Sequence, residues 1–349
     1  MIEINNIRVK NIYYMLSYAF RVLKEEGYRK LGSEEFENTG ELFAAILLQG
    51  LSSQIKKGLL KEYIPKQDSL STPRGKIEIS ESIKGMVIQK RQLICSFDEY
   101  SVNAYMNRII KSTMLLLLKS DISKSRKKEI KKLLVFLEEV EVLDVTQVNW
   151  KLNYNKNNQT YRMMIAICEL TIKGLLQTTE DGKTRMMHFL DERKMHKLYE
   201  KFILEYYRTE HKELLAYAPE IPWVLDDAED IMLPKMQSDI VLKDSSSGKT
   251  LIIDAKYYSH NVQIQYDVAT VHSGNLYQIF TYVKNMDVDN TGNVAGMLMY
   301  AKSNDLMQPC NLSYSMHGNK IMVKTLDLNL EFAMIKEQLD DVVKNYFVD

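Results

Sequence analysis

The sequence predicts a two-domain protein of the α+β or α/β class. We expect a mainly helical N-terminal domain with short strands, then a domain with a mixed central sheet flanked by helices. Apolar residues recur at helical spacing through much of residues 1–190, whereas β-rich runs bounded by turn residues appear after residue 190. The 349 residues suffice for two ordinary domains, which we place at 1–190 and 191–349.

The first domain should contain several amphipathic helices, because apolar residues return to one helix face at three- and four-residue spacing. These helices are expected over residues 11–23, 41–55, 105–119 and 123–137. The last begins with a basic run: Lys124, Arg126, Lys127, Lys128, Lys131 and Lys132. Such a run is typical of a solvated helix face, and contact with phosphate is the alternative. Short strands are predicted over 75–83 and 93–101.

The second domain should open with an amphipathic helix, on which Met195, Tyr199 and Phe202 share one stripe. Strand-like runs follow, separated by polar turn residues, which predicts a hairpin. The runs cover 235–243 and 249–258, with the turn at 244–248; a helix over 273–284, a buried strand over 294–300, a hairpin around 317–319 and a helix over 331–347 come next. This order predicts a mixed sheet covered by helices.

Composition argues against several classes of protein. Basic and acidic residues both number 46, so the net charge is zero, which argues against strong DNA binding by this chain alone. A local basic face, or a partner that holds the DNA, stays compatible with this balance. The three cysteines are far apart and form no C-x-x-C, so we expect neither a disulfide framework nor a zinc or iron–sulfur site.

The N-terminus shows no signal peptide, and apolar runs such as 42–48 are far too short to span a membrane. We therefore expect a cytoplasmic protein with no membrane partner. Two segments, 247–250 and 181–184, resemble the end of a P-loop. The earlier glycine that such a loop needs is replaced by Lys243 and Gln177, so the chain is expected to bind no nucleotide.

The pattern that carries chemistry is Asp239, followed fifteen residues later by Asp254-Ala255-Lys256. A hairpin would place the two carboxylates on adjacent strands, where they could share one Mg²⁺ ion. Lys256 points to the same face as Asp254 and could orient water or stabilise developing negative charge. These charges end the apolar run 251–253, where they are costly unless paired or metal-bound. A structural ion pair between Asp254 and Lys256 is the alternative.

Further side chains extend this candidate site. Gln278 and Tyr282 are four residues apart and share one face of a predicted helix. A helix edge with one core aromatic residue is the alternative. Glu200, at the edge of the first amphipathic stripe, could add a third carboxylate or be an ordinary surface residue.

Asp239, Asp254-Ala255-Lys256 and Gln278-x-x-x-Tyr282 together resemble the RecB-like branch of the PD-(D/E)xK nucleases. Ser238 stands where the name of the motif has proline. The resemblance implies that the acidic pair binds Mg²⁺, that the lysine assists water activation, and that the Gln-x-x-x-Tyr helix supports the site and contacts DNA.

N-terminal patterns narrow the resemblance to the McrC family, the nuclease subunits of McrBC restriction systems in phage defence. These patterns occupy 11–18, 74–78, 97–99 and 107–111. The resemblance implies a Mg²⁺-dependent endonuclease acting on double-stranded DNA. A McrB-like AAA+ GTPase hexamer would recruit and drive it, and the N-terminal domain would dock there and stimulate nucleotide hydrolysis. The Arg74–Gly75 turn is a candidate contact, with a simple tight turn as its alternative.

Other functions fit parts of the same pattern. A McrC-like component could serve a motor that recognises an unmethylated sequence. A RecB-like repair nuclease would act on DNA ends, but the chain shows neither a helicase motor nor an iron–sulfur cysteine set. A non-catalytic activator of an AAA+ ring would have a degenerate site, and the complete Asp/Asp/Lys set argues against that.

Overall fold

The structure, a computed structural model, describes residues 7–24, 28, 30–156, 158–176, 192–226, 232–258, 260–265, 268–309 and 311–348. The chain divides into two compact units: unit 1 is Met1–Thr39 with Met187–Asp349, and unit 2 is Gly40–Met186. Unit 2 is thus an insertion in unit 1. The boundary predicted at residue 190 lies outside the described residues.

The N-terminal helix α1 (Val9–Ala19) belongs to unit 1, whereas the predicted domains group it with the helices of residues 1–190. Asn11 Nδ2 donates to the carbonyl oxygens of Leu328 at 2.7 Å and Leu330 at 2.8 Å. Tyr14 stacks on Phe332 with ring centroids 4.2 Å apart. The periodicity of α1 shows that one face is apolar, but it carries no information about which element covers that face.

Unit 1 is built on a six-stranded mixed sheet, which confirms the predicted α/β class. Its order is β12 (Leu312–Met316), β13 (Asn319–Leu326), β11 (Val294–Ala301), β8 (Thr250–Lys256), β7 (Ile240–Lys243) and β4 (Leu215–Tyr217). The three strands β13, β11 and β8 are parallel, whereas β12, β7 and β4 run antiparallel to their neighbours. β8 and β11 are buried along their whole length, as parallel strands covered on both faces must be.

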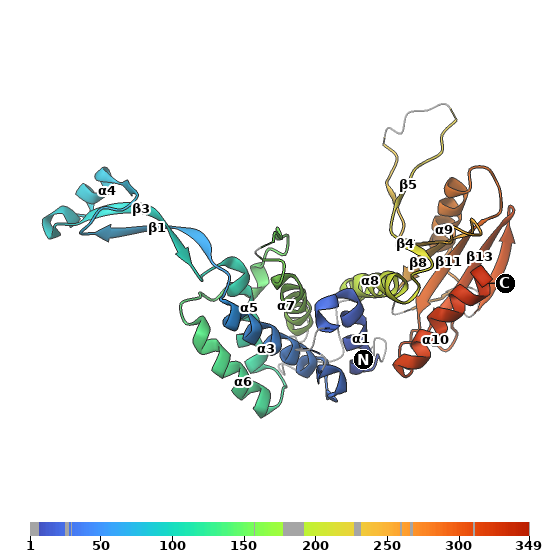
Figure 1. Ribbon diagram of the computed structural model, residues 1–349, viewed down its shortest axis with the longest axis horizontal. Coiled ribbons are helices and arrows are strands. Elements are labelled where there is room, and N and C mark those ends of the chain that lie inside the picture. The colour runs from blue at the N-terminus through green and yellow to red at the C-terminus, as the bar shows by residue number, and fades with distance from the viewer. Residues whose placement is uncertain are drawn as a thin grey trace. The chain divides into compact units, whose positions relative to one another are not determined.

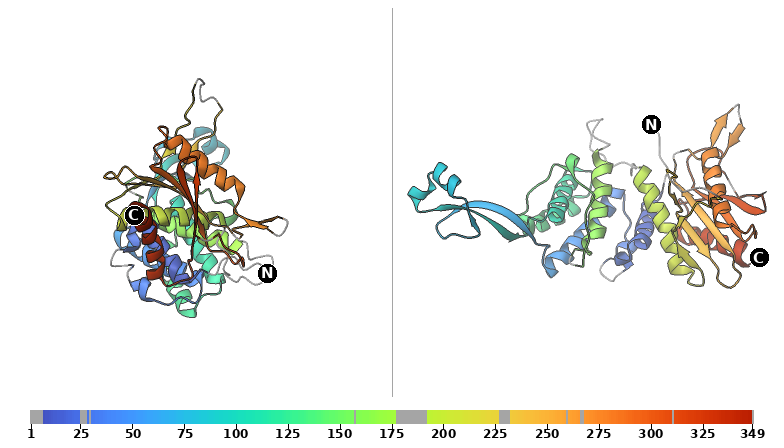
Figure 2. Two further views of the ribbon diagram at one scale, coloured as in Figure 1. Left: turned by 90° about the vertical axis from the view of Figure 1, so that its right-hand side faces the viewer. Right: turned by 90° about the horizontal axis from the view of Figure 1, so that it is seen from above.

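Helices cover both faces of this sheet. Figures 1 and 2 show α9 (Ser273–Met286) on one face and α10 (Phe332–Val343) on the other. The helix α8 (Glu192–Glu210) lies beside α10, where Tyr207 donates its hydroxyl to the Leu339 carbonyl at 3.1 Å. The predicted helices of the second domain are therefore confirmed as the layers around its sheet.

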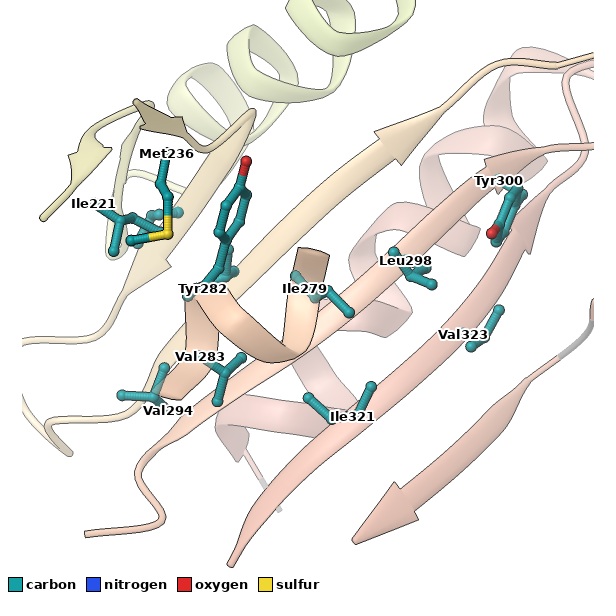
Figure 3. Close-up of a cluster of buried hydrophobic side chains, with 12 residues drawn as sticks. Ile221, Met236, Ile279, Tyr282, Val283, Val294, Leu298, Tyr300, Ile321 and Val323 are labelled. Carbon is teal, nitrogen blue, oxygen red and sulfur yellow. The ribbon is translucent and has the colours of Figure 1, made fainter. Parts of the chain in front are cut away.

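The helix α9 lies close to β11 because Gly296 leaves space for it. A Cβ at residue 296 would stand 2.7 Å from Ile279 Cγ1 and 2.9 Å from Val283 Cγ2, so a larger residue would require the α9 side chains facing it to shift. Figure 3 shows Ile279 and Val283 directed at the sheet and Tyr282 standing to the side of them. This packing fixes the position of the helix that carries Gln278.

The predicted strand 235–243 is interrupted in the structure. β6 (Met236–Gln237) pairs with β5 (Glu220–Ile221), and the chain then moves across to the central sheet as β7. The Ser238 hydroxyl fixes this crossing by donating to the Pro219 carbonyl at 2.9 Å. A second small sheet pairs β9 (Gln263–Gln265) with β10 (Val268–Thr270).

Unit 2 is mainly helical, as predicted. Its helices are α3 (Thr39–Lys57), α5 (Tyr105–Lys119), α6 (Lys124–Leu134) and α7 (Tyr161–Leu176). Their buried faces form the core of the unit, with Phe43, Ile109 and Ile167 all fully buried. Among the helices in the described part of the chain, none is long and apolar enough to cross a membrane.

A long two-stranded ribbon extends from the helices of unit 2 (Figure 1). It consists of β1 (Glu62–Leu70) and β3 (Leu93–Ser101), which pair antiparallel over their full length. The predicted strand 93–101 is thus confirmed. The strand predicted over 75–83 is largely wrong: β2 (Lys76–Ile77) is only two residues long, and α4 (Ile79–Lys84) follows it.

Beyond the end of β2, the edge of β3 is satisfied by a side chain of α4, Ser82, and not by further strand pairing. The Ser82 hydroxyl donates to the Glu78 carbonyl at 2.8 Å, as it can only from a helical turn. The same hydroxyl accepts the backbone N–H of Ile94 at 2.8 Å, which a longer β2 would otherwise have satisfied.

Candidate active site

The β7–β8 hairpin brings Asp239 and Asp254 together, as the sequence predicts. Ile240 is the register partner of Ile253, so Asp239 and Asp254 occupy the next pair of positions along the two chains. Asp239 Oδ2 accepts the backbone N–H of Ala255 at 2.8 Å, which fixes its carboxylate against β8. Asp254 is only 2% exposed. The two carboxylates therefore lie together at the end of the hairpin, with Asp254 buried and Asp239 half-buried.

Lys256 lies on the same face of β8 as Asp254 and is also buried, with 6% of its surface exposed. Its Nζ is 2.7 Å from Asp254 Oδ2, yet that oxygen accepts no hydrogen bond of acceptable geometry in the described part of the chain. The ammonium instead donates to Gln278 Oε1 at 3.1 Å. The ion pair that the sequence suggested as an alternative is therefore present.

A line of hydrogen bonds links Lys256 to the helix α9. Gln278 accepts from Lys256 through Oε1 and donates through Nε2 to the Tyr282 hydroxyl at 2.9 Å. Tyr282 in turn donates to the Gln237 carbonyl at 3.1 Å, beside the start of β7. Figure 3 shows the Tyr282 hydroxyl directed away from the apolar cluster that anchors the rest of its ring. The Gln-x-x-x-Tyr spacing thus positions the lysine from one helix face.

Burial and mutual repulsion change the acidity of the paired carboxyl groups. Burial, the Asp254 charge and the Glu200 charge raise the pKa of Asp239 to about 8. Burial also raises the pKa of Asp254, although the Lys256 ammonium opposes this change. For Lys256, burial lowers the pKa, but the Asp254 carboxylate raises it further, so the ammonium stays charged. Without a cation, the pair therefore retains a proton near neutral pH.

Glu200 lies on α8, near enough for its charge to raise the pKa of Asp239. Its Oε1 is 2.6 Å from His196 Nδ1, one helical turn earlier. Across the described residues, no group of three or more His, Cys, Asp or Glu side chains is arranged to hold a metal ion. The structure thus brings together the two predicted aspartates, and it pairs Glu200 with His196.

Two features of this region have no counterpart in the sequence prediction. His196 was not singled out, although its four-residue spacing from Glu200 was available as a signal. Asn275, on α9, accepts from the Tyr258 hydroxyl at 3.3 Å and donates to the Tyr300 hydroxyl at 2.9 Å. That network ties the chain after β8 to α9 and β11, and only the fold reveals it.

The donor set suits Mg²⁺. This ion prefers hard oxygen ligands and is commonly held by one or two carboxylates, with water and phosphate completing its octahedron. Asp239 and Asp254 provide two such groups, and Asp254 Oδ2 is a buried oxygen without a hydrogen bond among the described residues. The pair fits a small divalent cation better than zinc, which favours nitrogen and sulfur ligands.

Comparison with known proteins places these features in a family. Residues 4–301 match the family model described as McrBC 5-methylcytosine restriction system component. The chain is 29% identical over 346 residues to the type IV methyl-directed restriction enzyme EcoKMcrBC of Escherichia coli K12, covering 97% of this chain and 98% of that protein.

Solved structures are similar as well. A chain from the assembly of Thermococcus gammatolerans McrB AAA+ hexamers with bound McrC matches with a TM-score of 0.52 at 16% identity. The match covers 97% of this chain and 75% of the other, and it shows that the fold is shared. A second chain, from the cryo-EM structure of the Thermococcus gammatolerans McrBC complex, covers 56% of each chain at 20% identity with a TM-score of 0.42.

Proposed function

Because the chain belongs to the McrBC 5-methylcytosine restriction system component family, we propose that it is the DNA-cleaving subunit of such a system. It hydrolyses a phosphodiester bond of double-stranded DNA, adding water across one P–O bond to leave a phosphate monoester and a free hydroxyl. The observation that supports this most directly is the buried Asp239–Asp254–Lys256 cluster, held by Gln278 and Tyr282 in the order the motif requires.

Asp239 and Asp254 would hold Mg²⁺, which supplies charge neutralisation at the scissile phosphate and activation of water. Lys256 places its ammonium on the same face as both carboxylates, where it can orient the attacking water or stabilise the negative charge of the transition state. Gln278 holds that ammonium by accepting a hydrogen bond from it through Oε1. Tyr282 fixes the Gln278 amide in turn, so both act as positioning residues.

We assign Glu200 an accessory role. Its charge acts on Asp239 from α8, and His196 holds its carboxylate at 2.6 Å. From there it can accept a hydrogen bond from ordered water without binding the metal itself. A metal-ligand role would need a change in the position of its side chain.

The partner that we propose is a McrB-like AAA+ GTPase hexamer. The related Thermococcus structure is an assembly of McrB AAA+ hexamers with bound McrC. In this chain α4 lies at the end of the ribbon of unit 2 (Figure 1), and large apolar side chains on and after it are exposed: Ile79 is 64%, Ile83 61% and Met86 65% exposed. Exposed apolar groups gathered on one projecting element are typical of a protein-binding surface. We propose that this ribbon docks on the motor and stimulates its nucleotide hydrolysis.

The experiment that tests the function is cleavage of modified plasmid DNA in Mg²⁺, by the chain alone and with its motor plus GTP. We expect cleavage only in the complete mixture. Asp254→Ala should lower the rate at least about a thousandfold, since removing a metal ligand removes both charge neutralisation and water activation. The matched control is Asp289→Ala, which removes an exposed aspartate from the turn after α9, away from the carboxylate pair and the ribbon, and should leave cleavage unchanged.

The same experiment separates this function from its alternatives. Cleavage of DNA ends by the chain alone would indicate a repair nuclease. Wild-type cleavage by Asp254→Ala, with intact stimulation of GTP hydrolysis, would contradict the active-site assignment and favour a non-catalytic activator. Cleavage that ignores base modification would indicate a motor that reads an unmodified sequence.

A further inference from the structure

The helix α6 in unit 2 carries a stripe of lysines. Lys124, Lys128, Lys131 and Lys132 are all exposed, and their spacing of four, three and one residues places them along one side of the helix. The opposite side is anchored by Ile130, which is fully buried. Figure 1 shows α6 at the margin of the helices of unit 2. We call these four residues the lysine stripe.

The charges of the lysine stripe are not neutralised by the protein. Within the residues that the structure describes, no ion pair involves any of its four ammonium groups. Nearby acidic groups pair with Arg126 instead: its Nε is 3.5 Å from Glu41 Oε2, and its Nη1 is 3.5 Å from Glu129 Oε2. The net charge of the whole chain is zero, so this accumulation is a local feature and does not reflect a generally basic protein.

At the N-terminal end of α6 the arrangement also works against the stability of the helix, whereas Lys131 and Lys132 in the last turn do not. Like charges four residues apart repel each other across one helical turn, as Lys124 and Lys128 do. The N-terminal end of a helix bears a partial positive charge and favours acidic residues, yet the first turn of α6 contains none. A polyanionic ligand would remove both unfavourable effects at once.

We propose that the lysine stripe binds the phosphate backbone of duplex DNA, independently of sequence. DNA as the ligand rests on the proposed function, whereas the stripe itself lies outside the nuclease site. Lysine is a flexible point charge that contacts phosphate without reading bases. It is depleted from the cores of protein–protein interfaces, and the stripe contains no apolar anchor of the kind such cores need. DNA therefore fits this surface better than an acidic protein does.

The test compares two charge-matched variants of the full chain, alone and with its motor. The first replaces Lys124, Lys128, Lys131 and Lys132 with glutamine, which has a similar helix propensity. The control replaces Lys56, Lys57, Lys151 and Lys156, which are exposed in the same unit but dispersed. Binding of a fluorescent DNA duplex is measured by anisotropy between about 50 and 200 mM salt. EDTA is present in the measurements on the chain alone, so no cleavage occurs there and failure of the nuclease assignment cannot affect them.

We expect the stripe variant to bind about ten- to a hundredfold more weakly at about 50 mM salt. The slope of log K against log salt should fall by about 3 to 4, since each phosphate contact contributes about 0.9. The control should keep the wild-type affinity and slope. An unchanged slope in the stripe variant, an equal loss in the control, or no salt-dependent DNA binding by the wild-type chain in either form would overturn the proposal. Normal DNA binding with lost motor association would assign the stripe to an acidic protein surface instead.

Discussion

The β7–β8 hairpin and the β1–β3 ribbon are both antiparallel pairs, but they hold opposite kinds of residue in opposite surroundings. β8 is buried at every position and ends in two charged groups, Asp254 and Lys256. The ribbon is mostly exposed and carries aromatic groups on its surface, such as Tyr63 at 72% and Tyr100 at 57% exposure. A buried charged side chain indicates a functional site, because burying a charge is costly unless it is paired or binds a ligand. An exposed apolar surface indicates a binding site for another protein.

The β7–β8 hairpin and the ribbon also differ in the contacts that hold them in shape. The position of the Lys256 side chain on β8 depends on a neighbouring helix. Gln278 reaches Lys256 only while α9 stays close to β11 at Gly296. The ribbon depends on its own backbone: Gly75 has a φ of +70°, and a Cβ there would meet the Ser96 carbonyl oxygen at 2.4 Å. The active site is therefore sensitive to packing far from the carboxylates, whereas the ribbon is sensitive only locally.

The largest effect that would test this dependence is expected from Gly296→Ala. The added methyl group would lie 2.7 Å from Ile279 Cγ1, so it must displace that side chain, and we expect α9 to shift with it. We expect the free energy of unfolding to fall by about 1–3 kcal/mol. Cleavage with the motor should slow by about 10- to 100-fold, because Gln278 no longer holds Lys256 in position.

The matched control for that variant is Gly274→Ala, also at α9, where an added Cβ meets no atom within 4 Å. It should be neutral or slightly stabilising. Thermal unfolding and single-turnover cleavage of both variants give the comparison. A Gly296→Ala protein with wild-type cleavage would show that the contact between α9 and Lys256 does not govern the rate.

An intermediate effect is expected from Asp239→Asn in the absence of metal. Because the folded chain raises the Asp239 pKa from 3.8 to about 8, it keeps a proton that the unfolded chain releases. The resulting stability is complete below the unfolded pKa and is lost as the pH rises through about 8. Asparagine cannot ionise, so we expect the variant to have a Tm about 2–8 °C higher than wild type at pH 8.5.

That difference should almost vanish near pH 4, where the wild-type carboxyl group is protonated in the folded chain. Calorimetric scans in EDTA across this pH range provide the measurement. Parallel pH profiles for the two proteins would mean that Asp239 is not the group that retains the proton. Added Mg²⁺ should stabilise the wild type increasingly as pH rises and should have little effect on the variant.

The smallest effect on stability is expected in the ribbon. Ile83→Ser, on the exposed face of α4, should change the free energy of unfolding by less than about 0.5 kcal/mol. It should nonetheless lower the stimulation of GTP hydrolysis by the motor, because the lost apolar group belongs to the proposed docking surface. Val142→Ser is the control, since Val142 is 55% exposed in the same unit but off the ribbon. Equal stimulation by Ile83→Ser and the wild type would contradict the docking role.

The β7–β8 hairpin could be predicted from the sequence better than the ribbon could. The strand β8 is evident because a buried strand is a continuous apolar run, and its charged end stands out against that run. The strand β1 was missed, since its sequence EYIPKQDSL includes a proline and has few apolar residues. A strand exposed on both faces produces no apolar alternation, so its pairing with β3 leaves no periodic signal.

The same reasoning explains which residues of the candidate site could be predicted from the sequence. Asp239, Asp254, Lys256, Gln278 and Tyr282 were identifiable because strand and helix geometry translate their spacing into a shared face. The Gly296 contact and the Asn275 network depend on which helix covers which strand, and no local pattern contains that information. His196 is an intermediate case. Its four-residue spacing from Glu200 is visible in the sequence, but only the structure shows that this pair lies near the two aspartates.

The discontinuity of unit 1 has a consequence for the synthesis of this protein. The helix α1 precedes unit 2 in the chain, yet Asn11 bonds to a carbonyl 317 residues later. Unit 2 is continuous in sequence and can fold while translation proceeds, since domains generally fold as units from the N-terminus. Unit 1 cannot be completed until β13 and α10, which follow unit 2 in the chain, have left the ribosome. A chain cut short before that point would thus contain the ribbon and the lysine stripe but not the packed unit that surrounds the Asp239–Asp254 pair.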